Sequence, residues 1–200
     1  VGLKLRINGS YCNLSCYMCF PYNSSTRRNE LKKVGVDWSE YDAGYVGVKS
    51  GQYERIIDDI LKNIHLVDYM NITGGEPIQL PKHWELIDTI PDEHAKNITL
   101  SYDTNLTELT WKDRTIFEVA EKFKSVRLGV SCDHYGKKLS WMRYPIDVDK
   151  FESNLTQAKS LITQLNCTVS LLNVHDVQDI YDYYKTKFGI NTTFVNVVIG

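Results

Sequence analysis

Short apolar runs alternate along this chain with longer segments whose apolar residues recur at helical spacing. The apolar runs are rich in Val, Ile and Leu, which is typical of buried parallel strands. They lie at residues 3–8, 69–73, 98–102, 125–131, 167–173 and 193–199. The helical spacing predicts helices at residues 52–64, 81–89, 111–123, 148–165 and 177–188. This alternation predicts an α/β fold built from βα units around a parallel sheet.

Local signals mark the ends of several predicted helices. Pro81 stands in a first turn, and Thr110 is a good N-cap for the helix predicted to begin at residue 111. Asp176 and Gly189 flank the last predicted helix as its N-cap and C-terminal glycine. The segment 21–49 is longer and less regular than an ordinary connection. It predicts either a loop beside a functional site or a partly helical surface insertion.

Length and charge restrict the class of protein. Two hundred residues are enough for one domain with one sizeable core. A net charge of −2 gives no reason to expect non-specific binding to nucleic acid or to an anionic membrane. No apolar run approaches the roughly 20 residues of a membrane span, and no signal peptide is visible. The chain begins and ends in strand patterns, so we expect residues 1–200 to form a core domain without its flanking parts.

Three cysteines, Cys12, Cys16 and Cys19, follow the first predicted strand with the spacing C-x3-C-x2-C. Three thiolates can hold three irons of a [4Fe–4S] cluster and leave the fourth iron open to a small molecule. The alternatives are a zinc site and a disulfide framework. However, zinc usually takes four ligands and the first histidine is His65, while five cysteines are sparse and odd in number. Free thiols favour a reducing compartment, so we expect the cytoplasm.

A second motif, Ile-Thr-Gly-Gly-Glu-Pro at residues 72–77, lies at the end of the second predicted strand. Together the two motifs resemble those of the radical S-adenosylmethionine (SAM) superfamily, and the resemblance covers essentially the whole chain. It implies an open partial (β/α)6 TIM-like barrel, since six βα units are too few for the full eight-stranded barrel. The pattern most resembles the branch that carries SPASM or twitch extensions, whose members often modify peptides or proteins.

The resemblance implies that residues of both motifs contact SAM. Met18, which precedes the last motif cysteine, would lie against the adenine or else pack within its own loop. Gly74 and Gly75 would let the backbone approach the ligand closely. Glu76 would accept a hydrogen bond from the amino group of SAM. By itself, Gly-Gly-Glu-Pro also fits a turn that ends a strand.

Two asparagines after later strands are further candidates from the same resemblance. Residues 103–106 resemble the family's Thr-Asn-Gly turn, with Leu106 in place of Gly. Asn105 would therefore contact SAM, or form only the turn. Asn173, at the end of the fifth predicted strand, would face the methionine or ribose part of SAM.

The fourth strand ends in a sequence that resembles Ser-Ile-Asp-Gly of the family, with Cys132 and His134 as departures. Ser131 and Asp133 share a face of an extended chain, so both would face the mouth of the barrel. Ser131 is expected near SAM, and Asp133 is expected to bind ribose or substrate. Arg143 lies twelve residues after Ser131 and would pair with the SAM carboxylate, or else be a surface arginine.

The remaining thiols and imidazoles predict no second site. Cys132 and Cys167 are isolated in the sequence and are interpreted as buried free thiols. Four histidines are interpreted as surface or loop residues: His65, His83, His94 and His175.

The resemblance implies an enzyme that uses [4Fe–4S] and SAM as cofactors. One electron from the cluster would cleave SAM to methionine and a 5′-deoxyadenosyl radical, which would abstract hydrogen from a substrate. The expected partners are a reductant such as flavodoxin or ferredoxin and a peptide or protein substrate. Two alternatives stay open: a radical SAM enzyme acting on a small molecule such as a nucleotide or sugar, and a metal-binding module without catalysis.

Overall fold

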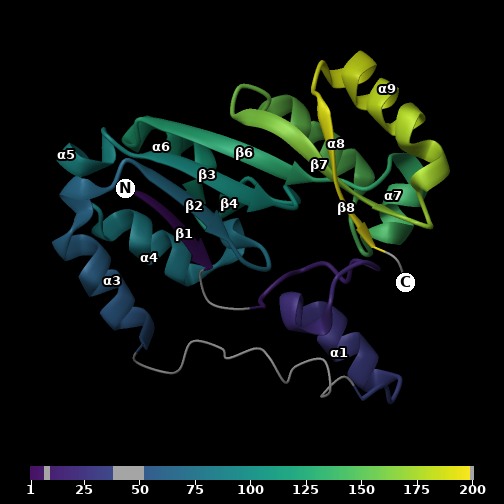
Figure 1. Cartoon of the computed structure of the whole chain (residues 1–200), viewed down its shortest axis with the longest axis horizontal. Coiled ribbons are helices and arrows are strands. Elements are labelled where there is room, and N and C mark those ends of the chain that lie inside the picture. Colours follow the sequence, from purple (N-terminus) through teal and green to yellow (C-terminus); the bar gives the residue numbers. More distant parts are fainter. Residues whose placement is uncertain (7–9, 38–51, 199–200) are drawn as a thin grey trace.

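A computed structural model describes residues 1–6, 10–37 and 52–198. Six strands form one sheet in the order β1-β2-β3-β6-β7-β8, and every neighbouring pair is parallel. The strands are β1 (Gly2–Arg6), β2 (Tyr69–Thr73), β3 (Thr99–Thr104), β6 (Ser125–Ser131), β7 (Ile162–Ser170) and β8 (Thr192–Val198). Strands β1 and β8 form the two edges of the sheet (Figure 1). This arrangement confirms the predicted α/β class and the open, partial TIM-like barrel.

Helices connect the strands, as expected for βα units. Eight α-helices are described: α1 (Ser25–Lys33), α3 (Gln52–Lys62), α4 (Pro81–Thr89), α5 (Asp92–Ala95), α6 (Ile116–Lys122), α7 (Gly136–Met142), α8 (Val148–Gln157) and α9 (Val177–Phe188). Short 3-10 helices lie at η1 (Pro21–Asn23), η2 (Ile64–Leu66), η3 (Pro77–Gln79) and η4 (Val174–Asp176). A small antiparallel pair consists of β4 (Thr110–Trp111) and β5 (Arg114–Thr115). Among the described helices, none is both long and apolar enough to cross a membrane.

The core lies against one face of the sheet. Side chains alternate between the two faces of a strand, and burial alternates with them in β2 and β3. In β3, Leu100 and Tyr102 are fully buried, whereas Ser101 and Asp103 are partly exposed. Ser101 and Asp103 line an open hollow with residues of β1 and β2. The chain therefore buries one face and leaves a polar face inside the partial barrel.

Three predicted elements differ from the observed ones. The predicted helix 111–123 begins only at Ile116, because residues 110–115 form the small hairpin and Thr115 caps the helix. The predicted helix 148–165 ends at Gln157, and β7 begins at Ile162 rather than at residue 167. Apolar residues of this segment fit a helical period, but pairing with β6 and β8 makes it a strand. The N-terminal part of segment 21–49 includes α1, while residues 38–49 lie outside the described part.

Of three further predictions about single residues, one is confirmed, one is correct in position only, and one is wrong. Gly189 ends α9 with a φ of 68°, the left-handed conformation typical of a C-terminal glycine. Asp176 does not cap that helix with its side chain. The interpretation of His83 as a surface residue is wrong, because it is fully buried and its Nε2 lies 2.9 Å from the Tyr102 hydroxyl. Burial lowers the pKa of His83 to about 3, so the ring is neutral at pH 7.

Candidate active site

The three motif cysteines lie in the loop that follows β1. Cys12 and Cys16 are buried, and Cys19 is partly buried. The polar N-terminus of α1 supports this loop, since the Thr26 hydroxyl donates to the Cys12 carbonyl at 2.6 Å and the Ser24 hydroxyl donates to the Leu14 carbonyl at 2.5 Å. Figure 1 shows α1 beside the loop, below the sheet. The predicted ligand loop is thus held by the helix that follows it.

The C-terminal end of α7 holds the opposite side of the cysteine loop. The Ser15 amide donates to the Tyr144 carbonyl at 2.6 Å, and the Tyr17 amide donates to the Met142 carbonyl at 2.8 Å. Arg143 lies between these two carbonyl groups in the chain. Backbone hydrogen bonds therefore bring Arg143 to the cysteines.

Gly75 allows a close backbone approach between the second motif and the cysteine loop. A Cβ atom at residue 75 would lie 1.9 Å from the Tyr11 carbonyl oxygen, which accepts a hydrogen bond from the Glu76 amide at 2.8 Å. Glycine is required here because any side chain would collide with backbone. The backbone that Gly75 approaches belongs to the cysteine loop, and the expected role of Gly74 and Gly75 toward SAM stays a prediction.

The Glu76 carboxylate joins the ends of β2 and β3. It is buried and accepts hydrogen bonds from the Thr104 hydroxyl at 2.7 Å, the Asn105 amide at 2.6 Å and the Ile78 amide at 3.3 Å. Burial raises the pKa of Glu76 to about 7, although these three hydrogen bonds favour the charged form. The carboxyl group is therefore poised to change charge near neutral pH.

Asn105 contacts the cysteine loop directly. Its Nδ2 lies 3.7 Å from the Cys12 sulfur and 2.9 Å from the Asn13 Oδ1. Its Oδ1 accepts a hydrogen bond from the Thr107 amide at 3.0 Å. Leu106 stands where the resemblance implies glycine, and its φ of 53° is the left-handed conformation that glycine adopts without strain. Asn105 therefore forms the predicted turn, and its expected contact with SAM stays a prediction.

Arg143 and Asp133 form a buried ion pair, with 2.6 Å between Nε and Oδ2. Arg143 is 8 % exposed, so the interpretation of this residue as a surface arginine is wrong. Its Nη1 lies 3.8 Å from the Cys16 sulfur. Burial by itself would lower the pKa of Arg143, but Asp133, Cys16 and Cys19 together raise it above its ordinary value.

The three thiols differ in how readily they lose a proton. Burial raises the pKa of Cys12 to about 12. A hydrogen bond with Cys19 and burial raise the pKa of Cys16, whereas the same hydrogen bond lowers the pKa of Cys19 with help from Arg143. Metal binding requires thiolates and releases their protons. The buried Arg143 guanidinium favours that change at Cys16 and Cys19.

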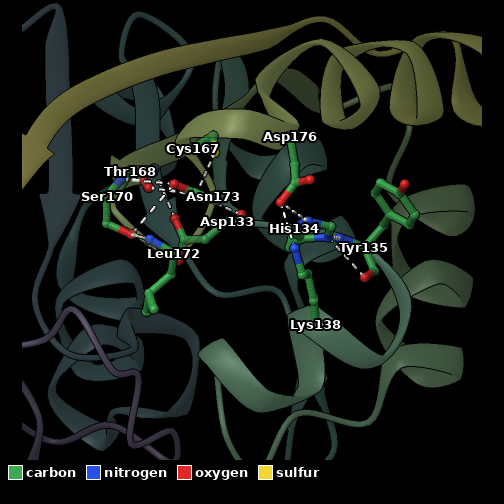
Figure 2. Close-up of polar contacts among 10 residues, drawn as sticks. All are labelled: Asp133, His134, Tyr135, Lys138, Cys167, Thr168, Ser170, Leu172, Asn173 and Asp176. Atoms are coloured by element: carbon green, nitrogen blue, oxygen red, sulfur yellow. Dashed lines mark hydrogen bonds and ion pairs between the residues drawn. The ribbon is translucent and has the colours of Figure 1, made fainter.

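Asn173 closes the loop after β7 onto the end of β6 (Figure 2). Its Nδ2 donates to the carbonyl groups of Asp133 and Thr168, both at 2.9 Å, and its Oδ1 accepts from the Ser170 amide at 2.8 Å. The Thr168 amide donates to Asp133 Oδ1 at 2.8 Å. Asn173 thus holds Asp133 in place, and its predicted contact with SAM stays a prediction.

His134 is a buried residue whose partners the sequence did not reveal (Figure 2). Its Nε2 lies 3.3 Å from Asp176 Oδ2, to which Lys138 Nζ also comes within 2.6 Å. Its Nδ1 accepts a hydrogen bond from the Tyr135 amide at 2.9 Å. The ion pair with Lys138 and the contact with His134 lower the pKa of Asp176. The sequence signal that could have indicated this contact is Asp176, an acidic residue directly before α9. Its side chain does not cap that helix and contacts His134 instead.

The other predicted residues lie near the same end of the sheet or in the core. Ser131 is the last residue of β6, and Met18 lies partly buried in the cysteine loop. Cys132 and Cys167 are fully buried free thiols, as predicted. Burial raises the pKa of each to about 12.

The donor set fits an iron–sulfur cluster. Three thiols lie in one loop, and two side-chain N–H groups point at two of their sulfurs. Across residues 1–6, 10–37 and 52–198, no three His, Cys, Asp or Glu side chains converge as ligands of a single metal ion. A cluster needs no such convergence, because each cysteine binds a different iron.

Comparison with known families identifies the class. The Radical SAM superfamily matches residues 9–184. The chain therefore belongs to the radical SAM superfamily, whose cofactors are a [4Fe–4S] cluster and SAM. Comparison with curated proteins finds no match.

Several solved structures share the fold. Native anSMEcpe with bound AdoMet is 24 % identical with a TM-score of 0.63, covering 98 % of this chain and 52 % of that chain. Native anSMEcpe with bound AdoMet and Cp18Cys peptide is 22 % identical with a TM-score of 0.62, covering 98 % and 50 %. SuiB of Streptococcus suis bound to S-adenosylmethionine is 17 % identical with a TM-score of 0.51, covering 100 % and 47 %. The chain spans about half the length of these proteins.

Proposed function

We propose that this chain is the catalytic core of a radical SAM enzyme. The observation that carries the proposal is the convergence of Glu76, Asn105 and Arg143 on the loop of the three motif cysteines. Glu76 and Asn105 come from the C-terminal ends of β2 and β3, where such barrels place their active sites. When bound, the cluster supplies one electron for reductive cleavage of SAM to methionine and a 5′-deoxyadenosyl radical, which abstracts hydrogen from the substrate.

The chain's own residues bind and orient the cofactors in this proposal. Cys12, Cys16 and Cys19 hold three irons as thiolates. The Glu76 carboxylate accepts from the SAM ammonium, and a cation at that position would favour its charged form. Arg143 offers a buried guanidinium for the SAM carboxylate.

Other residues complete the proposed SAM site. Met18 would pack against the adenine, and Ser131, the last residue of β6, would lie near the cofactor. The Asp133 carboxylate is engaged by Arg143 and the Thr168 amide. Asp133 therefore serves the site by holding Arg143, in addition to any contact with ribose or substrate.

We further propose a peptide or protein substrate and an enzyme of the branch with SPASM or twitch extensions, of which residues 1–200 are the core domain. The peptide bound to a structurally similar protein supports this class of substrate. A small molecule such as a nucleotide or sugar is the alternative. The electron would come from a flavodoxin or ferredoxin in the cytoplasm.

The decisive experiment is anaerobic reconstitution followed by analysis of iron, sulfide and 5′-deoxyadenosine formed with dithionite. We expect four irons per chain in the wild type, and loss of cluster and product in Cys12→Ala, Cys16→Ala and Cys19→Ala. Cys132→Ala and Cys167→Ala are matched controls that should keep both. Full activity in Cys16→Ala, or stoichiometric zinc without iron uptake, would contradict the proposal.

A further inference from the structure

Two side-chain N–H groups face the sulfurs of two motif cysteines. Asn105 Nδ2 lies 3.7 Å from Cys12 Sγ, and Arg143 Nη1 lies 3.8 Å from Cys16 Sγ. All four residues are buried. These distances suit hydrogen bonds to sulfur, whose radius is larger than that of oxygen. Both donors are far from the cysteines in the sequence: Asn105 directly follows β3, and Arg143 directly follows α7.

Asn105 is held in its place by contacts with three other residues. Its backbone amide donates to Glu76 Oε2 at 2.6 Å, and its Nδ2 also donates to Asn13 Oδ1 at 2.9 Å. Its Oδ1 accepts from both the amide and the hydroxyl of Thr107, at 3.0 and 2.7 Å. The Asn105 oxygen is thereby engaged on the side of Thr107, which leaves the amide nitrogen facing Cys12.

Arg143 is held by the buried Asp133 carboxylate. Asp133 in turn accepts from the Thr168 amide at 2.8 Å, and its carbonyl accepts from Asn173 at 2.9 Å (Figure 2). These contacts join the end of β6 to β7, so Asp133 has little freedom to move. The guanidinium is therefore fixed with Nη1 toward Cys16.

We infer that Asn105 and Arg143 are hydrogen-bond donors to the Cys12 and Cys16 thiolates and raise the reduction potential of a cluster held by these cysteines. The inference rests on the proposed function, because it needs a cluster at this loop. Hydrogen bonds to the sulfurs and net charge around a cluster both set its potential. Donors stabilise the electron-rich thiolates, and a buried cation favours the reduced cluster, which carries one more negative charge.

The test is a redox titration of the reconstituted chain without SAM, followed by electron paramagnetic resonance of the reduced cluster. Arg143→Gln removes the charge, and Asn105→Ser removes the Nδ2 donor but keeps an oxygen that can accept from Thr107. At a fixed potential, we expect the ratio of reduced to oxidised cluster to fall about tenfold in Arg143→Gln, a shift of about 59 mV for one electron. We expect a fall of about threefold in Asn105→Ser, since a neutral donor has the weaker effect.

Arg27→Gln is the matched control. Arg27 is also a cation beside the cysteine loop, but its guanidinium lies over the Tyr17 ring at 5.9 Å from the ring centroid. This control should titrate within about twofold of the wild type, because Arg27 is partly exposed and contacts the Tyr17 ring rather than a cysteine sulfur, so solvent screens its charge more than that of buried Arg143. Wild-type potentials in both Arg143→Gln and Asn105→Ser would overturn the inference. A wild type that takes up no iron would instead contradict the proposed function.

A measurement on the wild type covers the case in which Arg143→Gln does not assemble a cluster. Protein labelled with 15N-arginine should show a 15N hyperfine coupling in electron–nuclear double resonance of the reduced cluster. Arg27→Gln should retain this coupling. Its absence from the wild type would overturn the role of Arg143, whatever the variants do.

Discussion

At the scale of single residues, the site depends on side chains that join one loop to another. Gly75 allows the second motif to touch the cysteine loop, and Glu76 connects the ends of β2 and β3. Both were predicted from the sequence as contacts of SAM. The structure adds that each has a partner within the protein, so each also affects the stability of the folded chain.

Gly75→Ala should displace the cysteine loop. The added Cβ would meet the Tyr11 carbonyl oxygen at 1.9 Å, so backbone must move. We expect a loss of about 1–3 kcal/mol in the free energy of unfolding, and less iron per chain after reconstitution. Gly2→Ala is the control, because its Cβ would meet Tyr69 at an ordinary 3.6 Å. Urea unfolding and iron analysis measure both effects, and an unchanged Gly75→Ala would contradict the predicted collision.

Glu76 should make the stability of the chain depend on pH near neutrality. Its pKa is about 7 in the folded chain and 4.5 as the ordinary value. The folded state therefore binds this proton more tightly, and stability falls as pH rises from 4.5 to 7. Relative to Glu76→Gln, the wild type should lose on the order of 3 kcal/mol over that range. Urea unfolding midpoints at several pH values test this, and parallel profiles for the two proteins would argue against the raised pKa.

At the scale of elements, strand pairing in the small hairpin determines where α6 begins. Thr110 looks like an N-cap in the sequence, but residues 110–115 pair as a hairpin. The Thr115 hydroxyl instead accepts from the Glu118 amide at 3.2 Å and caps α6. The predicted N-cap at Thr110 is therefore wrong: Thr110 pairs with Thr115 in the hairpin, and the cap is Thr115, five residues later.

Thr115→Ala should therefore destabilise the chain more than Thr110→Ala. Loss of an N-cap costs about 1 kcal/mol, while exposed Thr110 makes no cap. Thermal or urea unfolding of the two variants gives the comparison directly. Equal losses, or a larger loss for Thr110→Ala, would mean that the helix begins at the position that the sequence pattern suggested.

At the scale of the whole molecule, the Asp133–Arg143 pair connects the middle of the sheet to the cysteine loop. Asp133 follows β6 and is held by β7, and Arg143 follows α7 and reaches Cys16. The ends of β6 and β7 are thus connected, through this ion pair, to the cysteine loop that precedes α1. The sequence placed both residues in the site but could not show that they contact each other.

Asp133→Asn should strongly destabilise the chain, because it leaves the Arg143 charge buried without its partner. Removing one member of a buried pair costs about 3–5 kcal/mol. Asp59→Asn is the control, because it removes a carboxylate from a surface pair in which Asp59 is 76 % exposed and Lys62 is 72 % exposed. This variant should change the free energy of unfolding by less than about 1 kcal/mol. Urea unfolding at pH 7 measures both. Similar small changes in the two variants would show that the buried pair contributes little.

The sequence alone determined the parallel α/β class, most of the strands, the cysteine motif and the family it indicates. These features depend on periodicity and on residue spacing over a few positions, which are local properties. Only the tertiary structure decided which donors face the cysteine sulfurs, since Asn105 and Cys12 are 93 residues apart and Arg143 and Cys16 are 127 apart. It also decided between helix and strand at residues 162–165, because pairing with two neighbouring strands outweighs a local helical period.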